Sequence, residues 1–245
     1  MTNTIASLRK LGVVALLVLW GSTLRAEVCA WTGNGGDVNW QTSGNWDVLP
    51  VSGRGDTLII PSGTSTSNDF TGLKIKALWF TGAAATAVSG NELEFSVAGS
   101  KKDFNLSNAC PLQIDFPVKV TKNFFGYYAA SGVDYLKPVS VVGAVQFTFG
   151  KANAADAEQG VCNFFGTVSA PDGTVGPGQG HNGTTYHKGI HFYGAVFAKV
   201  LKTYGNYNND YFLHSPGGDV KTVEVGFSHV FAMAENALGA ACVMK

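Results

Sequence analysis

Short segments of apolar residues alternate with turn residues along most of the chain. The segment Leu73–Phe80 begins with the period-two alternation of a half-buried strand. Between residues 27 and 230 no segment shows a sustained helical period, so we expect almost no helix there, and only Phe231–Leu238 is compatible with one. The pattern predicts further strands around Leu58–Pro61, Leu93–Val97, Leu112–Phe116, Val118–Phe125, Val139–Val142, Val145–Phe149, Val161–Val168, Gly189–Phe197 and Val223–Phe227.

A loose repeat runs through these strands, in which two adjacent aromatic residues are followed by glycine. Stacked coils of a solenoid share one core, and this imposes such a degenerate period. A β-sandwich also places strands at short, regular intervals. The pattern alone therefore leaves a β-solenoid and an antiparallel β-sandwich open. The repeat occurs at Trp79-Phe80-Thr81-Gly82, Phe124-Phe125-Gly126, Phe164-Phe165-Gly166 and Phe192-Tyr193-Gly194.

Composition favours the all-β class and excludes some partners. Glycine is the most unusual residue type, with 31 in 245 residues, and 16 phenylalanines accompany it, as expected for strands joined by tight turns. The 17 basic residues balance 17 acidic ones, so the chain lacks the charge of a nucleic-acid-binding protein. The segment Pro171–Gly183, rich in glycine and proline, is expected to be a flexible loop.

The first residues have the order of a secretory signal peptide. Arg9-Lys10 precede the apolar run Leu11–Trp20, and small residues lead to a cleavage site after Ala26. We therefore expect residues 1–26 to be a signal peptide, and the mature chain to be secreted or held at the outer cell surface, with no stable membrane span. Export permits disulfides, but the sequence leaves bridges and buried free thiols equally open for Cys29, Cys110, Cys162 and Cys242.

Several motifs resemble the bacterial autotransporter-type β-strand repeat family. The segment Trp31–Trp40, continued through Asn45-Trp46 and Gly55-Asp56-Thr57, looks like the family's N-terminal tryptophan and glycine motif. Leu73–Phe80 and Ile190–Gly194 are similar to its coil strands, and Glu235–Gly239 is similar to a signature that usually has more coils after it. The chain ends soon after this signature, which indicates a truncated or minimal passenger.

The resemblance implies an all-β, right-handed parallel β-helix. Residues 27–61 would form its N-terminal capping segment and residues 62–245 its solenoid coils, with exposed ends that could self-associate. The expected function is a non-enzymatic surface or secreted module for adhesion or structural display, with glycans or extracellular matrix as partners. The alternative is a carbohydrate-active enzyme on the same fold, a polysaccharide lyase or hydrolase. Fold alone does not choose between them.

Candidate binding residues are aromatic. Exposed tryptophans stack on sugar rings, but in a glycine-rich leading segment they also fit a plug for the open end of a β-helix, which we favour. Tyrosines interleaved with asparagines suit binding loops and turns between coils alike. Arg54-Gly55-Asp56 spells an integrin-recognition tripeptide, although Asp56 is better explained as a turn residue that accepts backbone hydrogen bonds. The candidates are Trp31, Trp40, Trp46, Tyr204, Tyr207 and Tyr211.

No catalytic residue, metal ligand or cofactor is expected. His187 and His191 would share a strand face but lie roughly 13 Å apart, too far for one ion. A lyase or hydrolase would need clustered carboxylates, and the available acids form no tight cluster in sequence. Their convergence in one groove would favour the enzyme, and dispersion would favour display. The acids concerned are Asp134, Asp156, Glu158, Asp172, Asp210 and Asp219.

Overall fold

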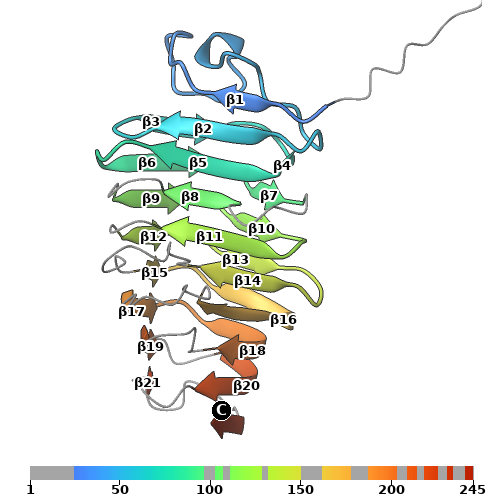
Figure 1. Cartoon of the computed structure of the whole chain (residues 1–245), viewed down its shortest axis with the longest axis vertical. Helices are drawn as coiled ribbons and strands as arrows, with labels where there is room; N and C mark the ends of the chain where they lie inside the picture. Colours follow the sequence, from blue (N-terminus) through green and yellow to red (C-terminus); the bar gives the residue numbers. More distant parts are fainter. Residues whose placement is uncertain are drawn as a thin grey trace, which may run out of the picture.

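The chain folds as an all-β protein with parallel strands (Figure 1). The structure is a computed structural model, and it describes residues 25–96, 103–106, 111–128, 132–149, 162–177, 187–202, 209–213, 218–225, 231–233 and 241–244. Within these residues the sole helical element is the 3-10 turn η1 (Ser43–Asn45). No helix among them is long and apolar enough to cross a membrane. The expected signal peptide lies almost wholly outside the described residues.

Successive coils stack along one axis and present three faces. The first face carries β1 (Val28–Ala30), β2 (Thr57–Pro61), β5 (Ala77–Thr81), β8 (Phe104–Leu106), β11 (Phe124–Tyr128) and β14 (Gln146–Phe149). The second carries β4 (Leu73–Ile75), β7 (Leu93–Phe95), β10 (Val118–Val120) and β13 (Val139–Val141). The third face is an eight-stranded sheet of β3 (Ser65–Asn68), β6 (Thr86–Gly90), β9 (Leu112–Asp115), β12 (Val133–Tyr135), β15 (Cys162–Phe164), β17 (His187–Phe192), β19 (Asn209–Leu213) and β21 (Phe231–Met233).

The first two faces merge toward the C-terminal end. The ten-residue strand β16 (Val168–Pro177) pairs with both β13 and β14. Its pairing with the following strand of the same sheet, β18 (Val196–Lys202), has a register shift between Ala170 and Thr174. Three further strands continue this joint sheet, namely β18 (Val196–Lys202), β20 (Gly218–Val225) and β22 (Ala241–Met244). The parallel pairing confirms the β-solenoid and excludes the antiparallel sandwich.

Identical inward positions stack from coil to coil, and this forms the core. On the third face the inward row contains Val88, Ile114, Tyr135, Phe164 and Phe192, all buried. The rings of Tyr135 and Phe164 are stacked with centroids 4.8 Å apart, and those of Phe164 and Phe192 with centroids 5.0 Å apart. Parallel stacking at this spacing follows from the roughly 4.8 Å separation of hydrogen-bonded strands.

Several sequence predictions merge or miss strands at the corners. The predicted strand Leu73–Phe80 is two strands, β4 and β5, because the chain turns at Lys76 onto another face. The prediction of a loop from residue 171 is wrong as far as Pro177, which ends β16. The helix-compatible segment is wrong at its start, because Phe231–Met233 is strand β21. Polar strands such as β3, Ser-Thr-Ser-Asn, carry no apolar alternation and were not predicted.

Two glycines of the aromatic repeat, Gly166 and Gly194, allow coils to approach closely at one corner. A Cβ on Gly166 would overlap the main chain of Lys137 and Pro138, and one on Gly194 would overlap the main chain of Gly166. In these two motifs the first aromatic, Phe164 or Phe192, is buried in the core, and the glycine permits the contact between coils.

Gly166→Ala should therefore destabilise the protein by about 2 kcal/mol, because the added methyl group meets main-chain atoms that cannot rotate away. Thr167→Ala, at the next position, removes atoms without adding any and should stay within about 0.5 kcal/mol of the wild type. Urea unfolding followed by circular dichroism measures both. Equal stability of the two variants would contradict this account of the glycine.

Candidate functional site

The three candidate tryptophans lie inside the N-terminal cap. Trp31, Trp40 and Trp46 are all buried, and Trp46 packs edge-on against each of the others with ring centroids 5.1 Å and 5.9 Å apart. Trp40 continues the cluster to Phe116 in the solenoid core. The Trp46 indole N–H donates a hydrogen bond to the Trp40 carbonyl oxygen at 2.7 Å. The rings cover the apolar end of the core, and none presents the open face that stacking on a sugar requires.

Asn45 holds the cap loop in place. It is fully buried, and its Nδ2 donates hydrogen bonds to the carbonyl oxygens of Asp37 and Asn39 and to Asp37 Oδ1. Its Oδ1 accepts a hydrogen bond from the Gly35 N–H at 2.8 Å. A Cβ on Gly35 would lie 2.7 Å from that Oδ1, so the close fit explains both the glycine and the asparagine of the segment.

Asn45→Ala should cost about 2 kcal/mol and open the cap, because several polar groups lose their buried partner at once. The measurement is tryptophan fluorescence, which should shift to longer wavelength as the indoles meet water. Asn34→Ala, at an exposed position of the same loop, is the control and should leave the spectrum unchanged. An unshifted spectrum in Asn45→Ala would contradict the role given to the side chain.

The Arg54-Gly55-Asp56 tripeptide is part of the same end and is not displayed. Asp56 is fully buried, and its oxygens accept hydrogen bonds from the Glu27 N–H, the Val51 N–H and Arg54 Nε, the last at 2.6 Å. This confirms the explanation of Asp56 as a backbone acceptor. Burial alone would raise the Asp56 pKa, but the bonds from Arg54 and the two main-chain donors outweigh it and lower the pKa.

The described cysteines are buried free thiols. Cys29 lies beside Arg54, whose Nη2 is 3.6 Å from its Sγ, and burial together with the Asp56 charge raises the Cys29 pKa to about 12. Cys162 is buried on β15, and burial also raises its pKa. Thiols that stay protonated are poor nucleophiles and poor metal ligands, so both are core residues. The side chains of Cys110 and Cys242 lie outside the described residues.

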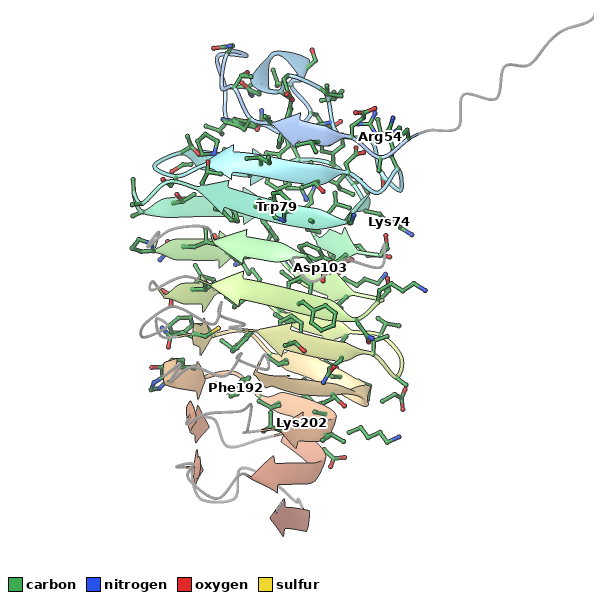
Figure 2. All side chains as sticks on the ribbon, viewed as in Figure 1. Arg54, Lys74, Trp79, Asp103, Phe192 and Lys202 are labelled. Atoms are coloured by element: carbon green, nitrogen blue, oxygen red, sulfur yellow. The ribbon has the colours of Figure 1, made fainter. Side chains whose placement is uncertain are left out.

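Asp103 is a second buried carboxylate with the opposite electrostatics. Figure 2 shows Asp103 midway down the solenoid, and the residue is only 2% exposed. Oδ2 accepts a hydrogen bond from the Phe125 N–H at 2.8 Å, while Oδ1 has no partner among the described residues. Burial raises the Asp103 pKa to about 6, against the smaller lowering effects of the Phe125 bond and the Lys76 charge.

The free energy of unfolding should fall as pH rises from about 4 to about 6, because folded Asp103 holds a proton there that the unfolded chain releases. The expected fall is about 2 kcal/mol. Asp103→Asn should remove this slope. Asp56→Asn is the matched control: the Asp56 pKa is lowered, so its contribution is lost only in more acidic solution and the slope should remain. Urea unfolding across this range measures all three proteins, and a slope unchanged in Asp103→Asn would contradict the assignment.

The third face has an outward row of polar side chains that runs along the solenoid. We call this row the polar strip; in coil order its register positions are Ser65, Ala87, Gln113, Asp134, Asn163 and His191. Each position lies one strand from the next, about 4.8 Å along the axis. Asn163 Nδ2 donates a hydrogen bond to Asp134 Oδ1 at 2.8 Å, which fixes both side chains relative to each other.

An open pocket of about 420 Å³ lies over the first four positions of the polar strip. Its polar lining comes from Ser65, Thr86, Gln113 and Asp134. Its apolar lining comes from Ala85, Ala87 and Pro111, with Gly132 beside them, while Leu112, which also lines it, is 3% exposed and belongs to the core. The pocket combines hydrogen-bonding groups with apolar side chains.

Two exposed aromatic rings flank the other end of the polar strip. Phe165 and Tyr193 are 45% and 41% exposed, and their rings stack with centroids 4.7 Å apart. They lie two residues beyond Asn163 and His191, so they point outward on the same face. The Tyr193 ring is also parallel to that of His191, with centroids 6.1 Å apart. Sequence reasoning noted these aromatics as a repeat but missed that one ring of each pair is outside.

The outer surface of the second face is charged instead. Glu94 lies between two lysines on neighbouring strands, 3.7 Å from Lys74 Nζ and 3.1 Å from Lys119 Nζ. Lys74 projects from the side of the solenoid in Figure 2. These ion pairs join three successive coils by their side chains, in addition to the main-chain ladder.

The described acids named from the sequence are divided between two faces. Asp134 is on the third face, whereas Asp172 and Asp219 are exposed on β16 and β20 of the joint sheet. Asp156 and Glu158 lie outside the described residues, as does the side chain of Asp210. In the part of the chain that the structure describes, no three histidine, cysteine or acidic residues are grouped to hold a metal ion.

The structure describes little of the candidate tyrosines. Tyr204 and Tyr207 lie outside the described residues. Tyr211 is in β19, at the register position that Val133 and Cys162 occupy on earlier coils, and its side chain is not described. The proposed tyrosine-rich binding loop therefore stays a prediction.

No protein-family model, no curated protein and no solved structure matches the chain. The parallel β-solenoid defines its structural class, and membership of the autotransporter-type repeats remains a prediction from the motifs quoted above.

Proposed function

We propose that the chain is an exported, non-enzymatic β-solenoid module for adhesion or structural display, similar in role to an autotransporter passenger. One observation carries the proposal: the described acids named from the sequence are divided between the third face and the joint sheet, and Asp115, on the strand next to Asp134, is paired with Lys137. Cleavage of a glycosidic bond by a pair of carboxylates needs them within about 5 to 10 Å across one groove. Asp134 on the third face has its hydrogen bond with Asn163, and Asp172 and Asp219 belong to the joint sheet.

The division between inward and outward rows also supports display. Inward positions repeat the same large apolar residues and leave little freedom, as in Phe164 and Phe192. Outward positions differ from coil to coil, as in Gln113, Asp134 and Asn163. A rigid scaffold with variable outer side chains is the arrangement that binding surfaces commonly use.

The test compares binding with cleavage. Particles coated with the full chain should adhere to cells or glycan-rich matrix more than particles coated with an unrelated β-protein. Incubation with soluble polysaccharides should release no new reducing ends and no unsaturated products. Release of either product, lost in Asp134→Asn, would overturn the proposal in favour of the polysaccharide lyase or hydrolase. Absence of adhesion to every surface would overturn it as well.

A further inference from the structure

We infer that the polar strip on the third face, with its pocket and flanking aromatic rings, binds a neutral polysaccharide chain lying along the solenoid axis. This inference rests on the proposed function and assigns a ligand class to it. The residues concerned differ from the tryptophans and tyrosines that the sequence indicated. Strands β3, β6, β9 and β12 line the pocket, and the strip continues over β15 and β17.

The chemistry of the strip suits hydroxyl groups. Gln113 and Asn163 carry amides that both donate and accept, Ser65 carries a hydroxyl group, and Asp134 carries a carboxylate that accepts strongly. Asp134 Oδ1 accepts a hydrogen bond from Asn163 Nδ2, and this bond fixes the orientation of the carboxylate. Asp134 Oδ2 takes no part in that bond. Groups that hold such an orientation before binding lose less entropy when a ligand arrives.

The spacing suits a polymer of rings. Hydrogen-bonded strands place the polar positions about 4.8 Å apart along the axis, close to the length of one sugar unit in an extended chain. The pocket of about 420 Å³ offers the apolar side chains of Ala85, Ala87 and Pro111 to the C–H face of a ring. At the far end, Phe165 and Tyr193 stack on each other, so their exposed edges form an apolar wall beside the strip.

Charge distinguishes this ligand from other polymers. The strip contains one carboxylate and no lysine or arginine, so an acidic polysaccharide or a nucleic acid would meet repulsion without a compensating cation. Lys137 Nζ lies 3.3 Å from Oδ1 of Asp115, which is on the same strand as Gln113. This lysine therefore already has an anionic partner. A folded protein partner would require a broader apolar surface than two aromatic rings provide.

The experiment is affinity electrophoresis of the full chain in gels containing soluble β-glucan, galactomannan or arabinoxylan, with polygalacturonate and heparin as acidic probes. We expect retardation by at least one neutral polymer. Gln113→Ala combined with Phe165→Ala should weaken that binding about tenfold or more. Asp134→Asn, which keeps an acceptor for Asn163, should weaken it less than Asp134→Ala.

Matched controls come from the other faces. Gln146→Ala on β14 and Phe197→Ala on β18 remove the same side-chain types at outward positions, and Phe197 is similarly exposed at 40%. These two variants should bind like the wild type. Circular dichroism of every variant establishes that the fold is retained before binding is compared.

The outcomes separate this inference from the proposed function. Binding to acidic probes alone, binding to no neutral polymer, or equal binding by strip and control variants would overturn the inference. Adhesion that survives the strip variants would overturn it while leaving the display module in place. Polysaccharide cleavage would overturn the display module, whether or not the strip variants bind.

Discussion

The main-chain ladder between parallel coils is the interaction on which the rest of this structure depends. Each strand pairs with the strand one coil away, so a side chain lies over its counterpart in the previous coil wherever the register is unbroken, as it is from β9 through β12 and β15 to Ile190–Phe192. Inward positions must therefore stack apolar on apolar, and corners must admit close main-chain contact. The stacked rings of Tyr135, Phe164 and Phe192 meet the first requirement, and Gly166 with Gly194 meets the second.

A stack of coils exposes its core at the end, and the N-terminal segment covers it with unusual side chains. The tryptophan cluster supplies the apolar cover. Asn45 and Asp56 satisfy main-chain donors that no neighbouring coil can pair. Gly35, Asn45 and Asp56 are therefore explained by the geometry of the cap. The integrin-like tripeptide has the same explanation, since Arg54 and Asp56 pair with each other.

The sequence pattern predicted the all-β class and most apolar strands, because inward rows need large apolar residues at regular positions. The pattern left the solenoid and the sandwich open, and the parallel solenoid was predicted from the resemblance of the motifs to a repeat family. The sequence did not predict where coils turn, since Lys76 between β4 and β5 carries no turn signal. It missed β3, whose residues are polar although Thr66 and Asn68 are buried. The polar strip could not be predicted from the sequence for a different reason. Gln113, Asp134 and Asn163 are far apart in sequence, and only the strand register brings them into one row.

The orientation of the strands has a mechanical consequence. All strands run across the long axis in Figure 1, so the hydrogen bonds between coils point along that axis. A pulling force applied at the two ends loads one coil interface at a time and peels the end coil away, instead of shearing many bonds together. Under tension the protein would therefore lengthen in steps, one coil at a time.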